Sequence, residues 1–207
     1  MDTYILDTNL FFNMEPGLGM GKKTEDVMVA FTKAGEKLKK EGKAEFFMPP
    51  SIVKELLSFF DDKEQVFLKE FLSIVTVKSP ETSRVNFPAD TFYKLVKDIR
   101  ERSHRGLVIA EEELKETAKS AAGKNFESKQ AFEKAMGARI KPLRDRYRNA
   151  TRTGFLDSVA DLDLIVLAKE QDGYVVTTDE GVLAWGRAFG VREMEASILG
   201  KKLSALL

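Results

Sequence analysis

The sequence contains no cysteine, and this absence excludes disulfides, thiol nucleophiles and thiolate metal sites. Histidine occurs once, as His104, so serine–histidine–aspartate chemistry would depend on a single residue. No segment approaches the roughly 18 to 20 consecutive apolar residues that are needed to cross a bilayer. Together these absences favour a reducing setting, and we expect a cytoplasmic protein that makes no use of a membrane.

Net charge is also lacking, because 33 basic and 33 acidic residues cancel. The cations are unevenly distributed, however, and residues 139–152 carry five net positive charges in fourteen residues. Guanidinium groups on an exposed helix face suit phosphates, so we predict that this segment binds RNA. The alternative is an ordinary solvated face, and Pro142 is placed where it could kink the helix. The basic residues of the segment are Arg139, Lys141, Arg144, Arg146, Arg148 and Arg152.

Short apolar runs that alternate with amphipathic segments indicate the fold class. Runs at residues 4–6, 45–48, 74–77, 174–178 and 191–194 are typical of strands, and helical patterns lie between them. Such alternation predicts an α/β fold, with a parallel sheet covered by helices on both faces. Residues 83–151 show helical periodicity and no strand signal, which predicts an inserted helix pair. We therefore expect a core of residues 1–82 and 152–207, interrupted by a helical insertion at 83–151.

Aspartates accompany the most apolar parts of this pattern. Asp7 ends the first predicted strand and Asp179 ends the fourth, and ligands of open α/β sheets bind beyond the carboxyl ends of strands. Asp157 and Asp161 are four residues apart, which places them on one face of a predicted helix at 155–171. Asp163 is turned about 200° from Asp161 on an ideal helix, so its inclusion depends on local geometry.

Several carboxylates at one edge would repel one another unless a cation lay between them. Oxygen ligands of this kind suit a hard divalent ion, Mg²⁺ or alternatively Mn²⁺, which can activate water at a phosphate. The alternative is that the aspartates are helix caps and solvated surface residues. The convergence of Asp157, Asp161 and Asp179 with Asp7 favours the metal site.

Three motifs give the chain a resemblance to a known family. "YILDTNLF", the acidic helix "LDSVADLDLIVLA" and "VVTTDEG" resemble the metal site of the PIN-domain nucleases. In that family an early strand-end aspartate, a helix aspartate and a late T-x-D bind the metal. A glutamate after the second strand often joins them, and "PPSIVKEL" offers Glu55, for which an exposed helix position is an equal alternative.

The long insertion, the arginine-rich helix that ends in "RYRNATRTGFLDSVADLDL" and the "TTDEG" ending narrow the resemblance to the minimal protein-only ribonuclease P family, known as HARP. The similarity covers essentially the whole chain. It implies metal-dependent removal of the 5′ leader from precursor tRNA by a large homo-oligomer built from dimers. It also implies a catalytic role for five aspartates, of which all but Asp163 are our candidate metal ligands; Glu180 is left unassigned. The five are Asp7, Asp157, Asp161, Asp163 and Asp179.

Other functions fit the residues less well. "PGLGMGKKT" has Pro16 and Lys23 at two positions that a phosphate-binding P-loop requires to be glycine and serine or threonine. Asn9 stands where a haloacid-dehalogenase phosphatase has its second aspartate. A toxin-type PIN ribonuclease with another RNA target remains an alternative, although the insertion of nearly seventy residues argues against it. A non-catalytic RNA-binding partner of an RNA-processing enzyme would not need the acidic set.

Overall fold

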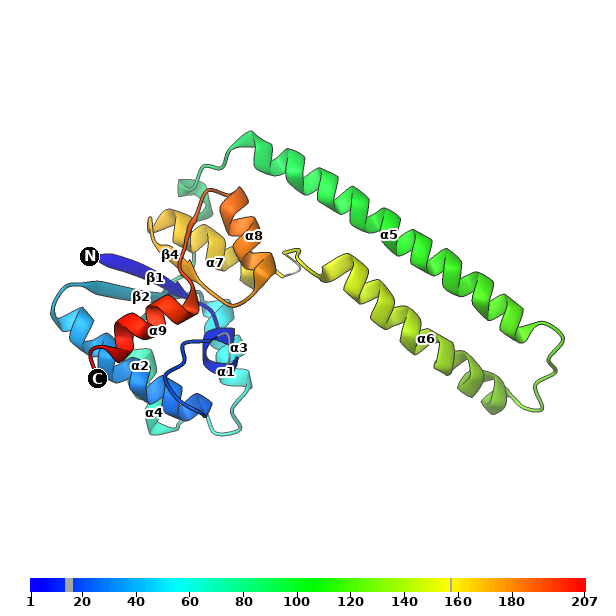
Figure 1. The fold of residues 1–207 in the computed structure, drawn as a ribbon, viewed down its shortest axis with the longest axis horizontal. Coiled ribbons are helices and arrows are strands. Elements are labelled where there is room, and N and C mark those ends of the chain that lie inside the picture. The colour runs from blue at the N-terminus through cyan, green and yellow to red at the C-terminus, as the bar shows by residue number, and fades with distance from the viewer. Residues whose placement is uncertain (14–16, 157) are drawn as a thin grey trace. The chain divides into compact units, whose positions relative to one another are not determined.

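The computed structural model describes residues 1–13, 17–156 and 158–207, and the chain forms two compact units (Figure 1). The first, called here the sheet unit, consists of Met1–Phe87 and Leu156–Leu207. The second, called the helical arm, consists of Pro88–Phe155. In the described ranges, no helix is both long and apolar enough to span a membrane.

The sheet unit is built on five parallel strands in the order β3-β2-β1-β4-β5. β1 and β4 are neighbours although more than 160 residues separate them, and Leu6 pairs with Val176 at their carboxyl ends. Each crossover between parallel strands requires a covering segment, which the helices supply. The strands are β1 (Asp2–Leu6), β2 (Ala44–Met48), β3 (Val75–Val77), β4 (Tyr174–Val176) and β5 (Arg192–Glu193).

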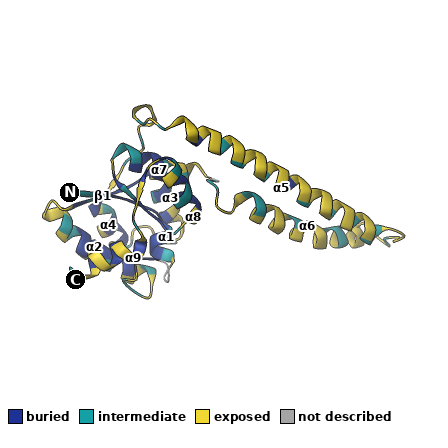
Figure 2. Cartoon of the chain, turned by 45° about the horizontal axis from the view of Figure 1, so that its top comes forward, coloured by how far each residue is buried: buried dark blue, intermediate teal, exposed yellow. Residues whose placement is uncertain are grey.

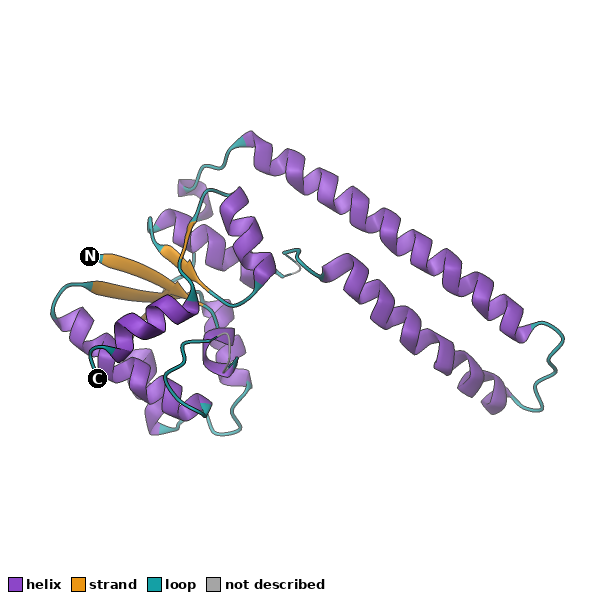
Figure 3. Cartoon of the chain, in the orientation of Figure 1, coloured by secondary structure: helices purple, strands orange, loops and turns teal. Residues whose placement is uncertain are grey.

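Helices flank the sheet, as Figure 3 shows. α2 packs against α4 and α9, whereas α7 packs against α3 and α8. The predicted parallel sheet flanked by helices, with an inserted helix pair, is therefore confirmed. The helices of the sheet unit are α1 (Asn9–Phe12), α2 (Thr24–Lys40), α3 (Pro50–Ser58), α4 (Val66–Ile74), α7 (Val159–Glu170), α8 (Glu180–Ala188) and α9 (Ala196–Ser204), with the 3₁₀ turn η1 (Thr82–Arg84).

The core lies between the sheet and these helices (Figure 2). Ile5 and Leu6 of β1 are fully buried, and α7 buries its whole segment Leu164–Ala168. Full burial of one such side chain contributes about 1.5–3 kcal/mol. The apolar run of α7 therefore fixes this helix against β1 and β4, and the acidic first half of the helix is held with it.

The helical arm is an antiparallel pair of long helices, α5 (Ala89–Ala121) and α6 (Lys129–Arg152). Most residues of the arm are exposed (Figure 2). A Cβ atom on Gly106 would lie 2.7 Å from Cε2 of Tyr147, so the glycine lets the tyrosine ring approach α5 closely. The arm is thus held by few close contacts and leaves most of its surface to solvent.

Two boundaries of the helical elements differ from the prediction. α7 begins at Val159 with Ser158 as its N-cap, and the Ser158 hydroxyl accepts from the Asp161 amide (3.0 Å), so the predicted start at 155 is wrong. The polar stretch expected between the arm helices is largely the second half of α5. Its glutamate, lysine and alanine residues are strong helix formers, which explains why helix persists without an apolar stripe. Pro142 lies inside α6 and does not end the helix.

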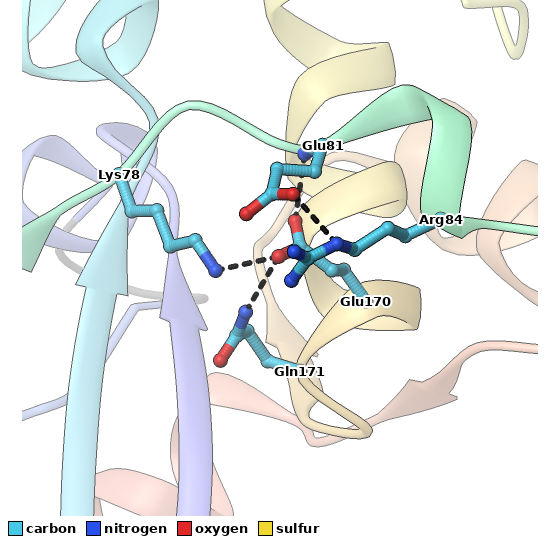
Figure 4. Close-up of polar contacts among 5 residues, drawn as sticks. All are labelled: Lys78, Glu81, Arg84, Glu170 and Gln171. Carbon is cyan, nitrogen blue, oxygen red and sulfur yellow. Dashed lines mark hydrogen bonds and ion pairs between the residues drawn. The ribbon is translucent and has the colours of Figure 1, made fainter.

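Glu170, the last residue of α7, holds the segment that leads from β3 toward the arm (Figure 4). Its carboxylate accepts from Lys78 Nζ (2.5 Å), from the Glu81 backbone amide (2.8 Å) and from Gln171 Nε2 (3.1 Å). Although burial opposes ionisation, these donors keep the pKa of Glu170 below its ordinary value. Only 6% of the Glu170 side chain is exposed, so this buried carboxylate fixes residues 78–84 to the end of α7.

Candidate active site

Asp7 lies directly after β1, at the edge where β1 and β4 both end. Its backbone amide donates to the carbonyl of Val176 at the end of β4 (3.2 Å). The side chain is 6% exposed. Parallel neighbours in a sheet end at the same edge, and the sequence therefore placed Asp7 correctly beside the residues that follow β4.

Thr177 links Asp7 to the loop that carries Asp179. Its hydroxyl donates to Asp7 Oδ2 (2.5 Å) and accepts from the Asp179 backbone amide (3.0 Å). Asn9 Oδ1 accepts from the neighbouring Thr178 amide (3.2 Å). These roles were not assigned from the sequence, although both residues stand in the motifs D-T-N and T-T-D that carried the resemblance. The hydrogen bonds explain why each motif includes a small polar residue beside its aspartate.

The carboxyl of Asp7 is electrostatically unusual. Burial raises the pKa of Asp7 to about 6, and the negative charges of Asp161 and Glu55 contribute to the rise. Hydrogen bonds from the Thr177 hydroxyl and the Thr8 amide act in the opposite direction. Asp7, Glu55 and Asp161 therefore interact through space, although they come from β1, α3 and α7.

Glu55 was only an even alternative from the sequence, and the structure brings it toward this group. It lies on the exposed face of α3, yet partial desolvation and the charge of Asp161 raise its pKa above the ordinary value. Mutual destabilisation of carboxylates is what a bound cation relieves. A donor set made only of carboxylate oxygens, one of them buried, fits a hard divalent ion.

The remaining predicted aspartates have different surroundings. Asp163 accepts a hydrogen bond from the Ser51 hydroxyl of α3 (2.9 Å), which joins α7 to α3. Asp179 is exposed and caps α8, because its Oδ1 accepts from the amides of Gly181 (2.6 Å) and Val182 (3.1 Å). Asp157, which we predicted on one helix face with Asp161, lies outside the described residues.

Comparison with known proteins identifies the family. A family described as PINc domain ribonuclease matches residues 3–207. The RNA-free ribonuclease P of Pyrococcus furiosus is 36% identical over 196 residues, which cover 95% of this chain and 89% of the relative. That of Thermococcus kodakarensis is 33% identical over 205 residues, 99% of this chain and 95% of the relative. That of Thermodesulfovibrio yellowstonii is 34% identical over 187 residues, 90% and 86% of the two chains. This chain belongs to the RNA-free ribonuclease P family.

Membership confirms the resemblance that the three motifs predicted, and it makes the chain a PINc-domain endoribonuclease. In the part of this RNA-free ribonuclease P family member that the structure describes, which omits Asp157, no group of three or more acidic or histidine side chains is arranged to hold a metal ion. The metal-ligand assignments therefore stay predictions. The pairwise interactions among Asp7, Glu55 and Asp161 are the structural observation that bears on them.

The predicted RNA-binding residues all lie on α6 of the arm. Arg144, Arg148 and Arg152 line one shallow hollow together with the ring of Tyr147. Arg139 lines a second hollow beside the apolar residues of both helices. Arg146 differs, because its guanidinium donates to Glu112 and Glu113 of α5 (both 2.5 Å). The full predicted set is Arg139, Lys141, Arg144, Arg146, Arg148 and Arg152.

Proposed function

We propose that this chain removes the 5′ leader of precursor tRNA by metal-dependent hydrolysis, leaving a 3′-hydroxyl on the leader and a 5′-phosphate on the tRNA. Likeness over nearly the full chain to proteins named RNA-free ribonuclease P supports the reaction. The structural observation that carries the proposal is the buried carboxyl of Asp7, which interacts with Glu55 and Asp161 at the carboxyl ends of β1 and β4.

PIN nucleases generally depend on divalent metal, and we propose Mg²⁺, with Mn²⁺ as a substitute. The proposed ligands are Asp7, Asp157, Asp161 and Asp179. When bound, the ion would activate water and offset negative charge at the scissile phosphate. In the protein, Thr177 holds the Asp7 carboxylate in one orientation and ties it to the loop of Asp179.

Asp163 belongs to the proposed catalytic set in a different way. Its hydrogen bond to Ser51 connects α7, which carries Asp161, with α3, which carries Glu55. We propose that Asp163 positions these two helices and is not itself a metal ligand. Rigid support of this kind keeps ligating side chains in place before the ion binds.

The helical insertion, residues 83–151, is proposed to bind the folded tRNA. Arg144, Arg148 and Arg152 share one hollow with Tyr147, which suits phosphates and stacked groups of an RNA surface. Arg139 and Lys141 extend the positive segment toward the start of the helix. Because Arg146 already pairs with two glutamates, an RNA phosphate would have to compete with Glu112 and Glu113 for it.

We also propose that the chain assembles into a large homo-oligomer built from dimers. The first turns of α5 support this, because they expose apolar side chains that a single chain leaves uncovered. The exposed fractions are 57% for Phe92, 78% for Tyr93, 65% for Val96 and 49% for Ile99. A second copy of the chain is the proposed cover, and light scattering of the purified protein should give a mass that is an even multiple of 23.3 kDa.

Cleavage of a 5′-labelled precursor tRNA tests the proposed function. The protein is incubated with the RNA and Mg²⁺ beside an Asp161→Asn variant that was purified identically, and the cut is mapped by primer extension. We expect a cut at the mature 5′ end that is lost in the variant and with EDTA. Cleavage elsewhere would indicate a PIN ribonuclease with another target. Salt-sensitive binding without any cleavage would indicate a non-catalytic RNA-binding partner.

A further inference from the structure

Arg102 of α5 holds the end of α6 and the residues that follow it. Its Nη1 donates to the backbone carbonyls of Thr151 (3.1 Å) and Thr153 (2.9 Å), and its Nη2 donates to that of Gly154 (3.2 Å). The guanidinium also lies over the ring of Phe155, 4.7 Å from its centroid. One side chain therefore contacts four of the last five residues of the arm.

The guanidinium is itself held in place. Its Nε lies 3.1 Å from Asp98 Oδ1, one helical turn earlier on α5, and only 11% of the Arg102 side chain is exposed. By contrast, 46% of the Arg146 side chain is exposed where it pairs across the same two helices. An ion pair that is largely withdrawn from water is screened less than an exposed pair. Arg102 is thus the buried and Arg146 the exposed link between the arm helices.

The acceptors of Arg102 are groups that a helix end leaves without partners. The last carbonyls of an α-helix have no intrahelical donor, and α6 ends at Arg152. Gly154 follows with a positive φ of 70°, so the chain turns sharply at this point. A planar guanidinium has five N–H donors in a fixed fork and can bind several carbonyls at once, which an ammonium group does much less well. Arg102 consequently fixes both the helix end and the turn.

The fixed segment leads directly to the proposed metal ligands. Phe155 precedes Asp157 by two residues, and α7 with Asp161 begins at Val159. We propose that Arg102 is a positioning residue, which fixes the exit of the arm so that the acidic segment after it is held ready to bind metal. This inference rests on the proposed function, since it assigns Arg102 to the support of that same site.

Metal binding and hydrogen exchange test the inference separately from cleavage. Arg102→Ala and Arg102→Lys are compared with the full-length wild type, with Asp161→Asn and with Glu113→Gln. The last variant removes a partner of Arg146 and so loosens the same helix pair away from the exit. The readouts are Mn²⁺ affinity by electron paramagnetic resonance, amide exchange of residues 153–158 by mass spectrometry, and single-turnover cleavage of precursor tRNA with tRNA affinity measured in parallel.

For Arg102→Ala we expect Mn²⁺ affinity to fall about tenfold, the loss typical when support of a metal ligand is removed. Amide exchange at 153–158 should accelerate and cleavage should slow to a similar degree, while tRNA affinity changes less than about threefold. Arg102→Lys should lie between Arg102→Ala and wild type in all three readouts. Glu113→Gln should match wild type in Mn²⁺ affinity and in exchange at 153–158.

Three results would overturn the inference. Wild-type Mn²⁺ affinity in both Arg102 variants would show that the exit segment is positioned without the guanidinium. An equal loss in Glu113→Gln would show a general effect of arm stability. If the wild type neither bound Mn²⁺ more tightly than Asp161→Asn nor cleaved the RNA, the proposed function would fail, and the inference with it. If Arg102→Ala does not fold, Arg102→Lys alone decides among these results.

Discussion

Key charged side chains are buried in the sheet unit and exposed in the helical arm. Asp7 is 6% exposed and its pKa is raised to about 6, and the Glu170 carboxylate is equally buried among donors. α6, all of whose residues are described, has no fully buried residue and carries its cations on the surface. Burial makes a charge depend on a partner, whereas exposure leaves it ready for a mobile polyanion. The difference assigns chemistry to the sheet unit and RNA binding to the arm.

Loss of the buried carboxylate should have the largest effect. For Asp7→Asn we expect cleavage to fall on the order of a thousandfold, as when one electrostatic contact to a transition state is removed. Affinity for precursor tRNA should stay within about threefold, because the arm is untouched. Single-turnover rates and filter-binding affinities of the two proteins measure both quantities. A parallel loss of affinity would break the division between the two units.

The same substitution should change how stability depends on pH. The folded-state pKa of Asp7, about 6, exceeds its ordinary value of 3.8, so the protonated form is favoured by folding. This contribution is present below pH 4 and is lost as pH rises through 6, a change of about 3 kcal/mol. Without metal, Asp7→Asn should melt close to wild type at pH 4 and roughly 6–12 °C above it at pH 7. Thermal unfolding in EDTA measures the difference, which would have to be pH-independent to contradict this account.

Removal of two exposed cations should weaken RNA binding without slowing the chemical step. For the double variant Arg144→Gln and Arg148→Gln, we expect tRNA affinity about 10- to 100-fold lower and a salt dependence that is less steep by about two contacts. The single-turnover rate at saturating protein should stay close to wild type. Lys129→Gln with Lys134→Gln removes the same charge from the same helix outside residues 139–152. An equal loss in this control would show that net charge, and not the positive segment, binds the RNA.

Glu170→Gln should lower stability more than it lowers activity. The change weakens the buried hydrogen bonds to Lys78 and to the Glu81 amide, and we expect a loss of about 2 kcal/mol. The melting temperature should fall by roughly 4–8 °C. Glu81→Gln is the matched control, since its exposed pair with Arg84 contributes little. Equal melting temperatures in the two variants would refute the role given to Glu170.

The smallest effect is expected where an aspartate only supports its neighbours. Asp163→Asn and Ser51→Ala each alter the same hydrogen bond, so both should cost about 1 kcal/mol of stability and slow cleavage by less than about fivefold. Urea unfolding and single-turnover rates compare the two. A loss in Asp163→Asn far beyond that in Ser51→Ala would make Asp163 a direct participant in catalysis.

The sequence predicted those features that depend on periodicity and strand order. Because parallel strands end at one edge, the placement of Asp7 beside the loop after β4 followed from two short apolar runs. The start of α7 did not follow, since the Ser158 cap competes with an apolar pattern that extends back to Phe155. The length of α5 was hidden because a helix rich in glutamate and lysine needs no apolar stripe.

Contacts between side chains that are distant in sequence could not be predicted. Thr177 reaches Asp7 across 170 positions, and Arg102 reaches Gly154 across 52. Neither residue type is distinctive by itself, and only the folded chain shows what each contacts. Glu55 was identified by its place after the second strand, but its interaction with Asp161 depends on how α3 packs against α7.

The ratio of cleavage rate to RNA affinity in Asp161→Asn tests the central claim most directly. Both are measured on one precursor tRNA in Mg²⁺, with the cut mapped to the nucleotide. We predict cleavage at the mature 5′ end by the wild type, a loss on the order of a thousandfold in the variant, and tRNA affinity that is unchanged or slightly tighter. Undiminished cleavage by the variant would contradict the assignment of catalysis to the carboxylates at the ends of β1 and β4.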